Sequence, residues 1–257
     1  MNGSPSVTRI NGRLWVSFDD HIDLKRLEGL EPEIAKGIAL AGHLAEPLST
    51  TTVESQYDKS VVETTVWMLE NPNDPELLDL KNSGATFRQQ FDFVRFRHKT
   101  VVFGEKIMLR SLENYAAGFA RKHIGRLNTD REAYKYFPGL KSFIEDSNIF
   151  KDIGRTLIFM SSPKAGVEIH SDYADRKTRR DQFIWLNIKG QKKFFVLDEN
   201  DQKDYIVGNC CVFDNANWHG ADPVQGSSFT VRVDGSFTDE WMHKTGIYEH
   251  FSKGRKS

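Results

Sequence analysis

The spacing of apolar residues changes near residue 154, and this change divides the predicted secondary structure into two parts. Between about residues 20 and 150 the spacing is helical, and Pro32 lies where the first turn of a helix tolerates proline. We interpret the aromatic stripes as core packing. Three helices are predicted, with apolar faces formed by Ile34, Ile38 and Leu40, by Phe87, Phe91 and Val94, and by Leu109, Leu112, Ala116 and Phe119.

Beyond Gly154, short runs of branched and aromatic residues predict strands separated by turn residues. The predicted strands are Thr156 to Met160, Val167 to His170, Phe183 to Ile188, Lys193 to Leu197, Tyr205 to Val207, Cys210 to Phe213 and Phe229 to Val233. Many short strands favour a double-sheet roll or barrel. We therefore expect an α+β fold, with a jelly roll in residues 151–257 and a mainly helical part, residues 1–150, packed around it. A last amphipathic piece, 239–251, is expected outside the roll, before a polar tail.

Composition narrows the class of protein. The chain has 257 residues, 39% of them hydrophobic, which is compatible with one large domain. Lys plus Arg (35) nearly balances Asp plus Glu (36), so nucleic acid is not favoured as a partner. We see neither the pattern of a signal peptide nor an apolar run long enough for a membrane helix. Cys210 and Cys211 are adjacent and point to opposite faces if they lie on a strand, so they provide neither a disulfide framework nor a zinc cluster. A cytoplasmic protein is expected.

A His-x-Asp tripeptide occurs twice, and its two copies fall in different predicted elements. His21 opens a predicted helix, where residues two apart point in different directions, so we interpret it as a surface or capping histidine. His170 and Asp172 close a predicted strand, where residues two apart share a face and can bind one ion. His219, 49 residues after His170, supplies a second imidazole. Two imidazoles and one carboxylate can hold one face of an iron(II) ion.

Arg232 has a predicted position beside this site. A hairpin centred on Gln225-Gly226 would place His219 opposite Arg232 on the neighbouring strand. Arg232 lies in an apolar run, where a guanidinium requires an anion. A carboxylate-bearing cosubstrate would meet it as a bidentate pair, and a structural ion pair with Asp234 or Asp222 is the alternative. For His219 the alternative is a satisfied core histidine.

The order of these residues resembles that of the 2-oxoglutarate-dependent non-haem iron oxygenases. The resemblance covers about residues 155–237 and implies a double-stranded β-helix core. His170, Asp172 and His219 would then ligate iron(II) as the catalytic metal centre. Arg232, 13 residues after His219, would bind the distal carboxylate of 2-oxoglutarate.

A second feature resembles the branch of that family that includes the asparaginyl hydroxylase and JmjC proteins. In that branch a lysine after an Ile-Lys-Gly-like turn binds the distal carboxylate, and Ile188-Lys189-Gly190-Gln191-Lys192 is similar to that turn. The interval between His170 and Lys192 is longer than in that branch. Arg232 is therefore the predicted anchor. Lys192 is the second candidate, although we interpret it first as a solvated lysine of the turn.

The resemblance implies the cofactors Fe(II), 2-oxoglutarate and O2 and an activity. The expected reaction is hydroxylation of an unactivated C–H bond, with conversion of 2-oxoglutarate to succinate. Asp172 favours hydroxylation over halogenation, because related radical halogenases have a small residue at the carboxylate position. Desaturation and ring closure use the same three ligands and stay open.

The substrate is the least constrained feature. A compact catalyst favours a small molecule such as an amino acid, and a protein or peptide hydroxylase of the same family is the alternative. The charged segment 173–181 is either a lid that pairs with a zwitterion or a solvated loop. Trp218 is a further candidate for the pocket wall, with core packing as the alternative, and Arg155 is a candidate from the first strand of the core. A cupin-type metal protein that does not use 2-oxoglutarate, and a non-catalytic binding module with an accidental triad, also stay open, as does the oligomeric state.

Overall fold

The protein combines helices with antiparallel sheets. The computed structural model describes residues 7–47, 57–97, 105–112, 128–161, 166–172, 182–190 and 192–252. The helices are α1 (Leu24–Glu28), α2 (Glu31–Ala41), α3 (Tyr57–Glu70), α4 (Pro75–Asn82), α5 (Phe87–Arg97), α6 (Pro138–Asp146), α7 (Asp239–Lys244) and α8 (Tyr248–Ser252), with the 3-10 helices η1 (Asp19–His21), η2 (Gly42–Leu44) and η5 (Glu132–Tyr136). The strands are β1 (Trp15–Ser17), β2 (Glu46–Pro47), β3 (Glu105–Leu112), β4 (Asn128–Asp130), β5 (Phe150–Ser161), β6 (Val167–His170), β7 (Gln182–Lys189), β8 (Lys193–Leu197), β9 (Lys203–Tyr205), β10 (Cys210–Phe213), β11 (His219–Asp222) and β12 (Ser228–Phe237).

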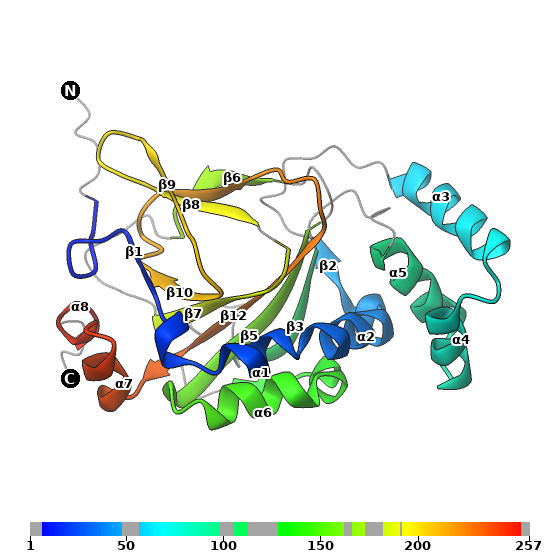
Figure 1. Ribbon diagram of the computed structural model, residues 1–257, viewed down its shortest axis with the longest axis horizontal. Helices are drawn as coiled ribbons and strands as arrows, with labels where there is room; N and C mark the ends of the chain where they lie inside the picture. The colour runs from blue at the N-terminus through cyan, green and yellow to red at the C-terminus, as the bar shows by residue number, and fades with distance from the viewer. Residues whose placement is uncertain are drawn as a thin grey trace.

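These strands form two sheets that face each other (Figure 1). The large sheet has the order β1-β10-β7-β12-β5-β3-β2, with β4 beside β3, and the small sheet has the order β6-β11-β8-β9. From β5 to β12 the chain passes repeatedly between them, because β5, β7, β10 and β12 lie in the large sheet and the strands between them lie in the small one. The strands β1 to β4, which come from the first part of the chain, extend the large sheet at its edges.

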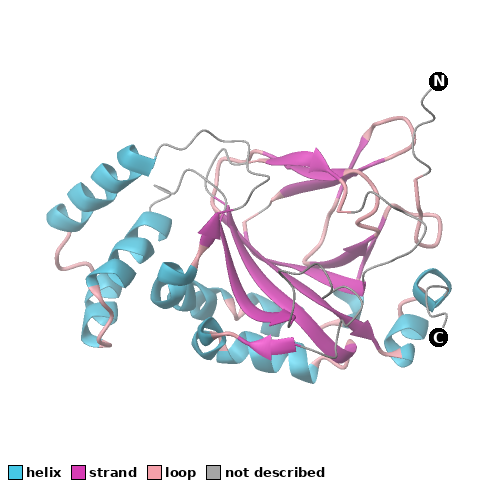
Figure 2. Ribbon diagram, turned by 180° about the vertical axis from the view of Figure 1, so that it is seen from behind, coloured by secondary structure: helices cyan, strands magenta, loops and turns pink. Residues whose placement is uncertain are grey.

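Helices cover one face of the large sheet, and the small sheet lies over the other (Figure 2). Alternation along the strands divides the side chains between two cores, since successive residues point to opposite faces. On β12, Val231 and Val233 pack with residues of α1, α2, α6 and α7. Arg232, between them, therefore points to the space between the sheets. Cys210 and Cys211 are both buried and belong to the two different cores, as the sequence predicts for a strand.

A carboxylate on α2 joins this helix to the start of α6. Glu33 on α2 accepts hydrogen bonds from the backbone N–H groups of Gly139 (2.8 Å) and Leu140 (3.0 Å) at the start of α6. This carboxylate therefore satisfies two N–H groups that a helix start leaves unpaired. Gly37 allows the close approach, because a Cβ there would lie 2.4 Å from Cε1 of Phe137.

The helices predicted at Ile34 to Leu40 and at Phe87 to Val94 are confirmed as parts of α2 and α5, although Phe87 itself is exposed. The helix predicted from Leu109 is wrong where the structure describes it, because residues 105–112 form β3. Buried residues alternate there with half-buried ones, as Ile107, Leu109 and Ser111 show, and this is the period of a strand. Ala116 and Phe119 lie outside the described residues.

Six of the seven predicted strands coincide with observed strands or lie within them. The prediction for Tyr205 to Val207 is shifted, since β9 ends at Tyr205. The last amphipathic piece consists of two short helices, α7 and α8. They pack, through Trp241, Met242 and Phe251, on the core between the helices and the large sheet, which we call the helix-side core. Across the described ranges, no helix has the length and apolar character needed to cross a membrane.

A pair of matched substitutions tests the helix-side core. Leu186 lies on β7, between β10 and β12, and is fully buried. We expect Leu186→Ala to lower the free energy of unfolding by about 2–5 kcal/mol, because it removes buried methyl groups and leaves a cavity. Leu69→Ala on α3 should change it by less than about 0.5 kcal/mol, since Leu69 is 75% exposed. Urea denaturation measures the free energy of unfolding of both variants, and equal losses would contradict the burial of Leu186.

Candidate metal centre

Three side chains converge at one edge of the small sheet, where β6 ends and β11 begins. His170, the last residue of β6, pairs directly with His219, the first residue of β11. Asp172 lies in the bend after β6, and its backbone N–H donates to the carbonyl of Asn215 (3.0 Å). One ligand atom from each of the three side chains lies within 4.8 Å of the others. The sequence prediction that His170, Asp172 and His219 form one group therefore agrees with their placement.

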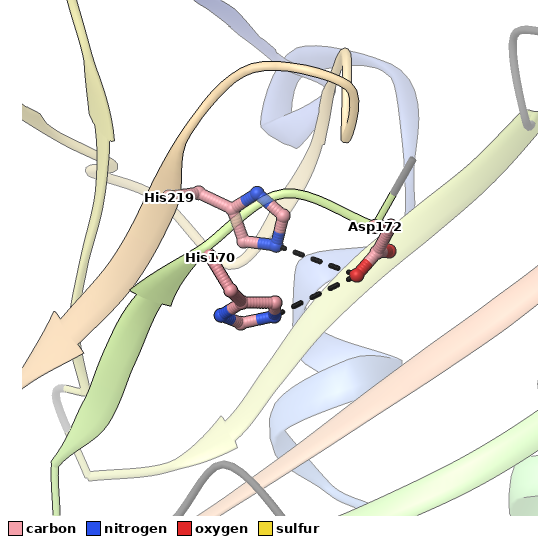
Figure 3. A group of neighbouring side chains, drawn as sticks. All are labelled: His170, Asp172 and His219. Carbon is pink, nitrogen blue, oxygen red and sulfur yellow. Dashed lines mark ion pairs between the residues drawn. The ribbon is translucent and has the colours of Figure 1, made fainter. Parts of the chain in front are cut away.

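Both imidazoles present the same nitrogen to the centre of this group (Figure 3). The Nε2 atoms of His170 and His219 lie 3.6 Å and 3.8 Å from Oδ1 of Asp172. The Nδ1 atoms lie 2.7 Å and 2.8 Å from backbone carbonyl oxygens, those of Glu168 and Asn217. Because a carbonyl oxygen only accepts, each Nδ1 carries the hydrogen, and Nε2 of a neutral ring keeps its lone pair for a metal ion.

The charge states of the buried members suit a metal ion. Burial disfavours the charged form of His219 and lowers the pKa of its imidazole to about 4. Burial alone would raise the pKa of Asp172, but the charges of Arg232 and His219 and the hydrogen bonds from Arg232 and Asn215 outweigh it and lower that pKa to about 2. At neutral pH the site therefore has a neutral imidazole and a carboxylate, the forms that bind metal ions.

The second oxygen of Asp172 has partners of its own. Oδ2 accepts hydrogen bonds from Nδ2 of Asn215 (2.8 Å) and from Nη1 of Arg232 (3.0 Å). Nε of Arg232 donates to Oδ1 of Asp234 (2.7 Å), and Oδ2 of Asp234 accepts from Nε of Arg155 (2.6 Å). A chain of alternating charges thus runs from Arg155 on β5, through Asp234 and Arg232 on β12, to Asp172.

The predicted hairpin between His219 and Arg232 is wrong. β11 pairs with β6 and β8 in the small sheet, whereas β12 pairs with β5 and β7 in the large sheet. The segment around Gln225-Gly226 is therefore a crossover between sheets. Arg232 nevertheless reaches the site, because alternation on β12 directs it between the sheets, where Asp172 meets it from the other side.

The structure also distinguishes the two ion pairs that were possible for Arg232, with Asp234 and with Asp222. Asp234 is its structural partner, as one alternative predicted. Asp222 is not, because its carboxylate accepts from Lys203 and Tyr205 (2.6 Å each). The first His-x-Asp copy has no part in the site: His21 ends η1, and the side chain of Asp23 caps α1 by accepting from the backbone N–H of Arg26.

A cavity of about 500 Å³ lies between the sheets, and Lys192 contributes to its wall. Nζ of Lys192 donates to Oγ of Ser161 (3.0 Å), and burial lowers the pKa of this amine to about 8. Two buried oxygens that line the same cavity, Oγ1 of Thr230 and Oδ1 of Asn187, have no hydrogen-bond partner among the described residues. The cavity thus combines a buried cation with polar atoms that a ligand can satisfy.

Aromatic side chains connect the cavity with the group formed by His170, Asp172 and His219. The rings of Trp185 and Phe194, which both line the cavity, have centroids 5.0 Å apart. Phe194 also packs against His219, with a centroid distance of 5.8 Å. Trp218 is 42% exposed, so it is not a core residue. The segment 173–181 lies outside the described residues.

Sequence reasoning missed three polar residues of this region: Asn215, Thr230 and Asn187. Asn215 and Thr230 are 1% exposed. The sequence could have indicated Thr230, because it precedes Arg232 by two residues on a strand and therefore lies on the same face. No comparable signal existed for Asn215, since its contact with Asp172 joins segments 43 residues apart.

No protein-family profile matches this sequence, and no curated protein matches it.

Several solved structures are similar at low levels. An oxidoreductase of the 2OG-Fe(II) oxygenase family from Burkholderia pseudomallei is 11% identical, with a TM-score of 0.35, over 52% of this chain and 68% of that one. A prolyl-4-hydroxylase from Pseudomonas putida is 9% identical, with a TM-score of 0.31, over 82% and 99%. A cupin protein from Desulfovibrio desulfuricans is 12% identical, with a TM-score of 0.24, over 31% and 70%. TM-scores this low do not place the chain in a family, so the geometry of the site alone bears on its function.

Proposed function

We propose that this protein is an Fe(II)- and 2-oxoglutarate-dependent oxygenase that hydroxylates a C–H bond of a small molecule. One observation carries the proposal: the Nε2 atoms of His170 and His219 converge with Oδ1 of Asp172. Two imidazoles and one carboxylate on one side of a metal ion are the ligand set of non-haem iron(II) oxygenases. This set leaves the opposite side of the ion open.

The strand order supports a double-stranded β-helix as the core of the proposed enzyme. Eight successive strands, β5 to β12, divide equally between the two sheets, and the metal-binding group lies at one edge of the small sheet. The proposed catalytic unit therefore extends from residue 150 to residue 237, with the helices outside it.

The donor set suits Fe(II), and the amine of Lys192 and the hydroxyl of Thr230 in the cavity wall suit a carboxylate. Fe(II) and 2-oxoglutarate, when bound, would supply the oxygen chemistry, in which O2 and 2-oxoglutarate convert R–H to R–OH with release of succinate and CO2. His170, Asp172 and His219 would hold the ion. The buried amine of Lys192 and the hydroxyl of Thr230 would donate to the distal carboxylate, which would satisfy an oxygen that is otherwise unpaired.

The anchor for that carboxylate is either Arg232, as the sequence favoured, or Lys192. Nε and Nη1 of Arg232 already donate to Asp234 and Asp172. Lys192 lies within the cavity and has no carboxylate within ion-pair distance among the described residues. This difference supports Lys192 as the anchor.

A small substrate is supported only by the size of the cavity, which 2-oxoglutarate would also occupy in part. A volume of about 500 Å³ lies within the usual range for small-molecule sites, roughly 300–1,000 Å³. A free amino acid is the class we propose first, with a peptide as the second. A cupin-type activity without 2-oxoglutarate remains the alternative chemistry, and it differs in a direct way: oxygen consumption would not depend on 2-oxoglutarate and no succinate would form.

Substitution of the proposed ligands tests the metal centre. We expect Asp172→Ala and His219→Ala to abolish succinate formation from 2-oxoglutarate under Fe(II) and O2. Each should weaken Fe(II) binding by more than the roughly 100-fold that loss of an outer partner costs. His21→Ala, in the other His-x-Asp copy, is the matched control and should retain both properties. Unchanged metal content in the two ligand variants, or wild-type turnover without 2-oxoglutarate, would contradict the proposal.

The pH dependence of 2-oxoglutarate binding distinguishes the two anchors. A bound carboxylate pairs with the charged amine of Lys192, whose pKa without ligand is about 8. Binding above that pH therefore requires uptake of a proton, and we expect the Kd of 2-oxoglutarate to rise by up to about tenfold per pH unit above pH 8. Calorimetric titration of the Mn(II)-loaded protein measures it.

The Lys192→Met variant is the control for this titration, and its weakened binding should not change with pH in that range. Arg232 keeps its charge throughout, because a guanidinium loses its proton only above about pH 12. A wild-type Kd that stays constant from about pH 7 to 9.5 would therefore assign the carboxylate to Arg232.

The class of substrate is tested by asking which compounds increase the conversion of 2-oxoglutarate to succinate. A panel of free amino acids, and short peptides containing the same residues, would be scored for succinate release above the rate without substrate. We expect at least one free amino acid to raise the rate and to gain one oxygen atom, as mass spectrometry would show. Stimulation by peptides alone would replace a small molecule with a polypeptide as the substrate.

A further inference from the structure

The two oxygens of Asp172 have different surroundings. Oδ1 faces Nε2 of His170 and of His219, whereas Oδ2 accepts two hydrogen bonds, from Asn215 and Arg232. We propose that Asn215 and Arg232 are positioning residues that hold Oδ2, so that Asp172 presents only Oδ1 to a metal ion. This inference rests on the metal centre of the proposed function and assigns to Arg232 a role other than cosubstrate anchor.

Asn215 holds Asp172 at two points. Its side-chain Nδ2 donates to Oδ2 of Asp172, and its backbone carbonyl accepts from the N–H of Asp172 (3.0 Å). The next residue adds a third attachment, since the carbonyl of Ala216 accepts from Oγ of Ser171 (2.9 Å). The turn between β10 and β11 therefore fixes both the backbone and the carboxylate of Asp172, and the same turn leads directly to His219.

Arg232 is itself fixed on several sides. Its Nε donates to Asp234, its Nη1 donates to Asp172, and its guanidinium carbon lies 4.3 Å from the centre of the Phe183 ring. Asp234 is held in turn by Arg155. A planar guanidinium can make these contacts together because its donors have a rigid fork geometry and its face stacks on an aromatic ring. An ammonium group has the same charge but cannot reproduce this arrangement.

The arrangement matters for the number of positions that remain on the metal. Two donors occupy the lone pairs of Oδ2, so the carboxylate contributes one oxygen atom. Three single-atom ligands leave three positions on a six-coordinate ion, which 2-oxoglutarate and O2 require between them. A carboxylate that bound through both oxygens would take one of these positions. Asn215 and Arg232 would therefore preserve the open face of the site.

Cobalt(II) binding to the full chain, in the absence of 2-oxoglutarate, tests this inference. Asn215→Ala removes one donor to Oδ2 without a change of charge, and Arg232→Lys removes the fork but keeps the positive charge. We expect each variant to bind Co(II) about 10- to 100-fold more weakly than wild type. The visible absorption of bound Co(II), which reports coordination number and geometry, should also change.

Two matched controls accompany the variants. Arg26→Lys alters an arginine–aspartate pair, Arg26 with Asp146, among the outer helices, and should leave Co(II) affinity and spectrum unchanged. Lys192→Met removes a cation from the cavity that does not contact Asp172, and should weaken 2-oxoglutarate binding with no change in Co(II) affinity. Far-ultraviolet circular dichroism confirms that each variant is folded. Arg232→Lys, the more conservative change, decides the matter if Asn215→Ala is not folded.

The outcomes separate this inference from the proposed function. If wild type does not bind Co(II), the metal centre itself is wrong. If wild type binds Co(II) and the folded variants match it in affinity and spectrum, the positioning role is wrong and the metal centre stands. If Arg232→Lys raises the Kd of 2-oxoglutarate without a change in Co(II) binding, Arg232 is the cosubstrate anchor and its positioning role is overturned.

Discussion

The carboxylate of Asp172 contacts side chains of both sheets. Its Oδ1 faces two histidines of the small sheet, and its Oδ2 accepts from Arg232 of the large sheet. Arg232 also pairs with Asp234, so its guanidinium bridges a carboxylate of its own strand and the carboxylate that comes from the small sheet. The direction of the arginine and the position of Asp172 are therefore coupled through one pair of charges.

The space between the sheets contains paired charges at one end, apolar side chains next to them, and a lysine in the cavity beyond. At one end, Arg155, Asp234, Arg232 and Asp172 form a chain of alternating charges, in which the two arginines hold the pKa of Asp234 below its usual range against the opposing effect of burial. Apolar packing around Phe194 follows, and Lys192 lies in the cavity beyond. Buried charge is unfavourable unless it is paired; the amine of Lys192 donates to Ser161, has no carboxylate partner among the described residues, and shares the cavity with the unsatisfied hydroxyl of Thr230 and the unsatisfied amide oxygen of Asn187.

The sequence contained enough to bring the three proposed metal ligands together but too little to arrange the residues around them. His170 and Asp172 were recognised because a strand places residues two apart on one face, and a period of two needs no knowledge of the partner strand. The same reasoning failed at residues 105–112, where Leu109 and Leu112 matched a helical spacing although the burial of Ile107 and Leu109 follows a strand. Both periods are compatible with a few apolar residues, and pairing with β5 decided between them.

For the strands that it predicted, the sequence by itself determined which residues share a face, so Arg232 lies on the face opposite to Val231 and Val233. It also determined that Cys210 and Cys211 belong to different cores. Only the tertiary structure decided what the inward residues meet. His219 faces His170 and not Arg232, and Asn215 holds Asp172, because the chain crosses from one sheet to the other between β11 and β12. Alternation is a local property of the backbone, whereas the pairing of distant strands depends on the packing of the whole chain.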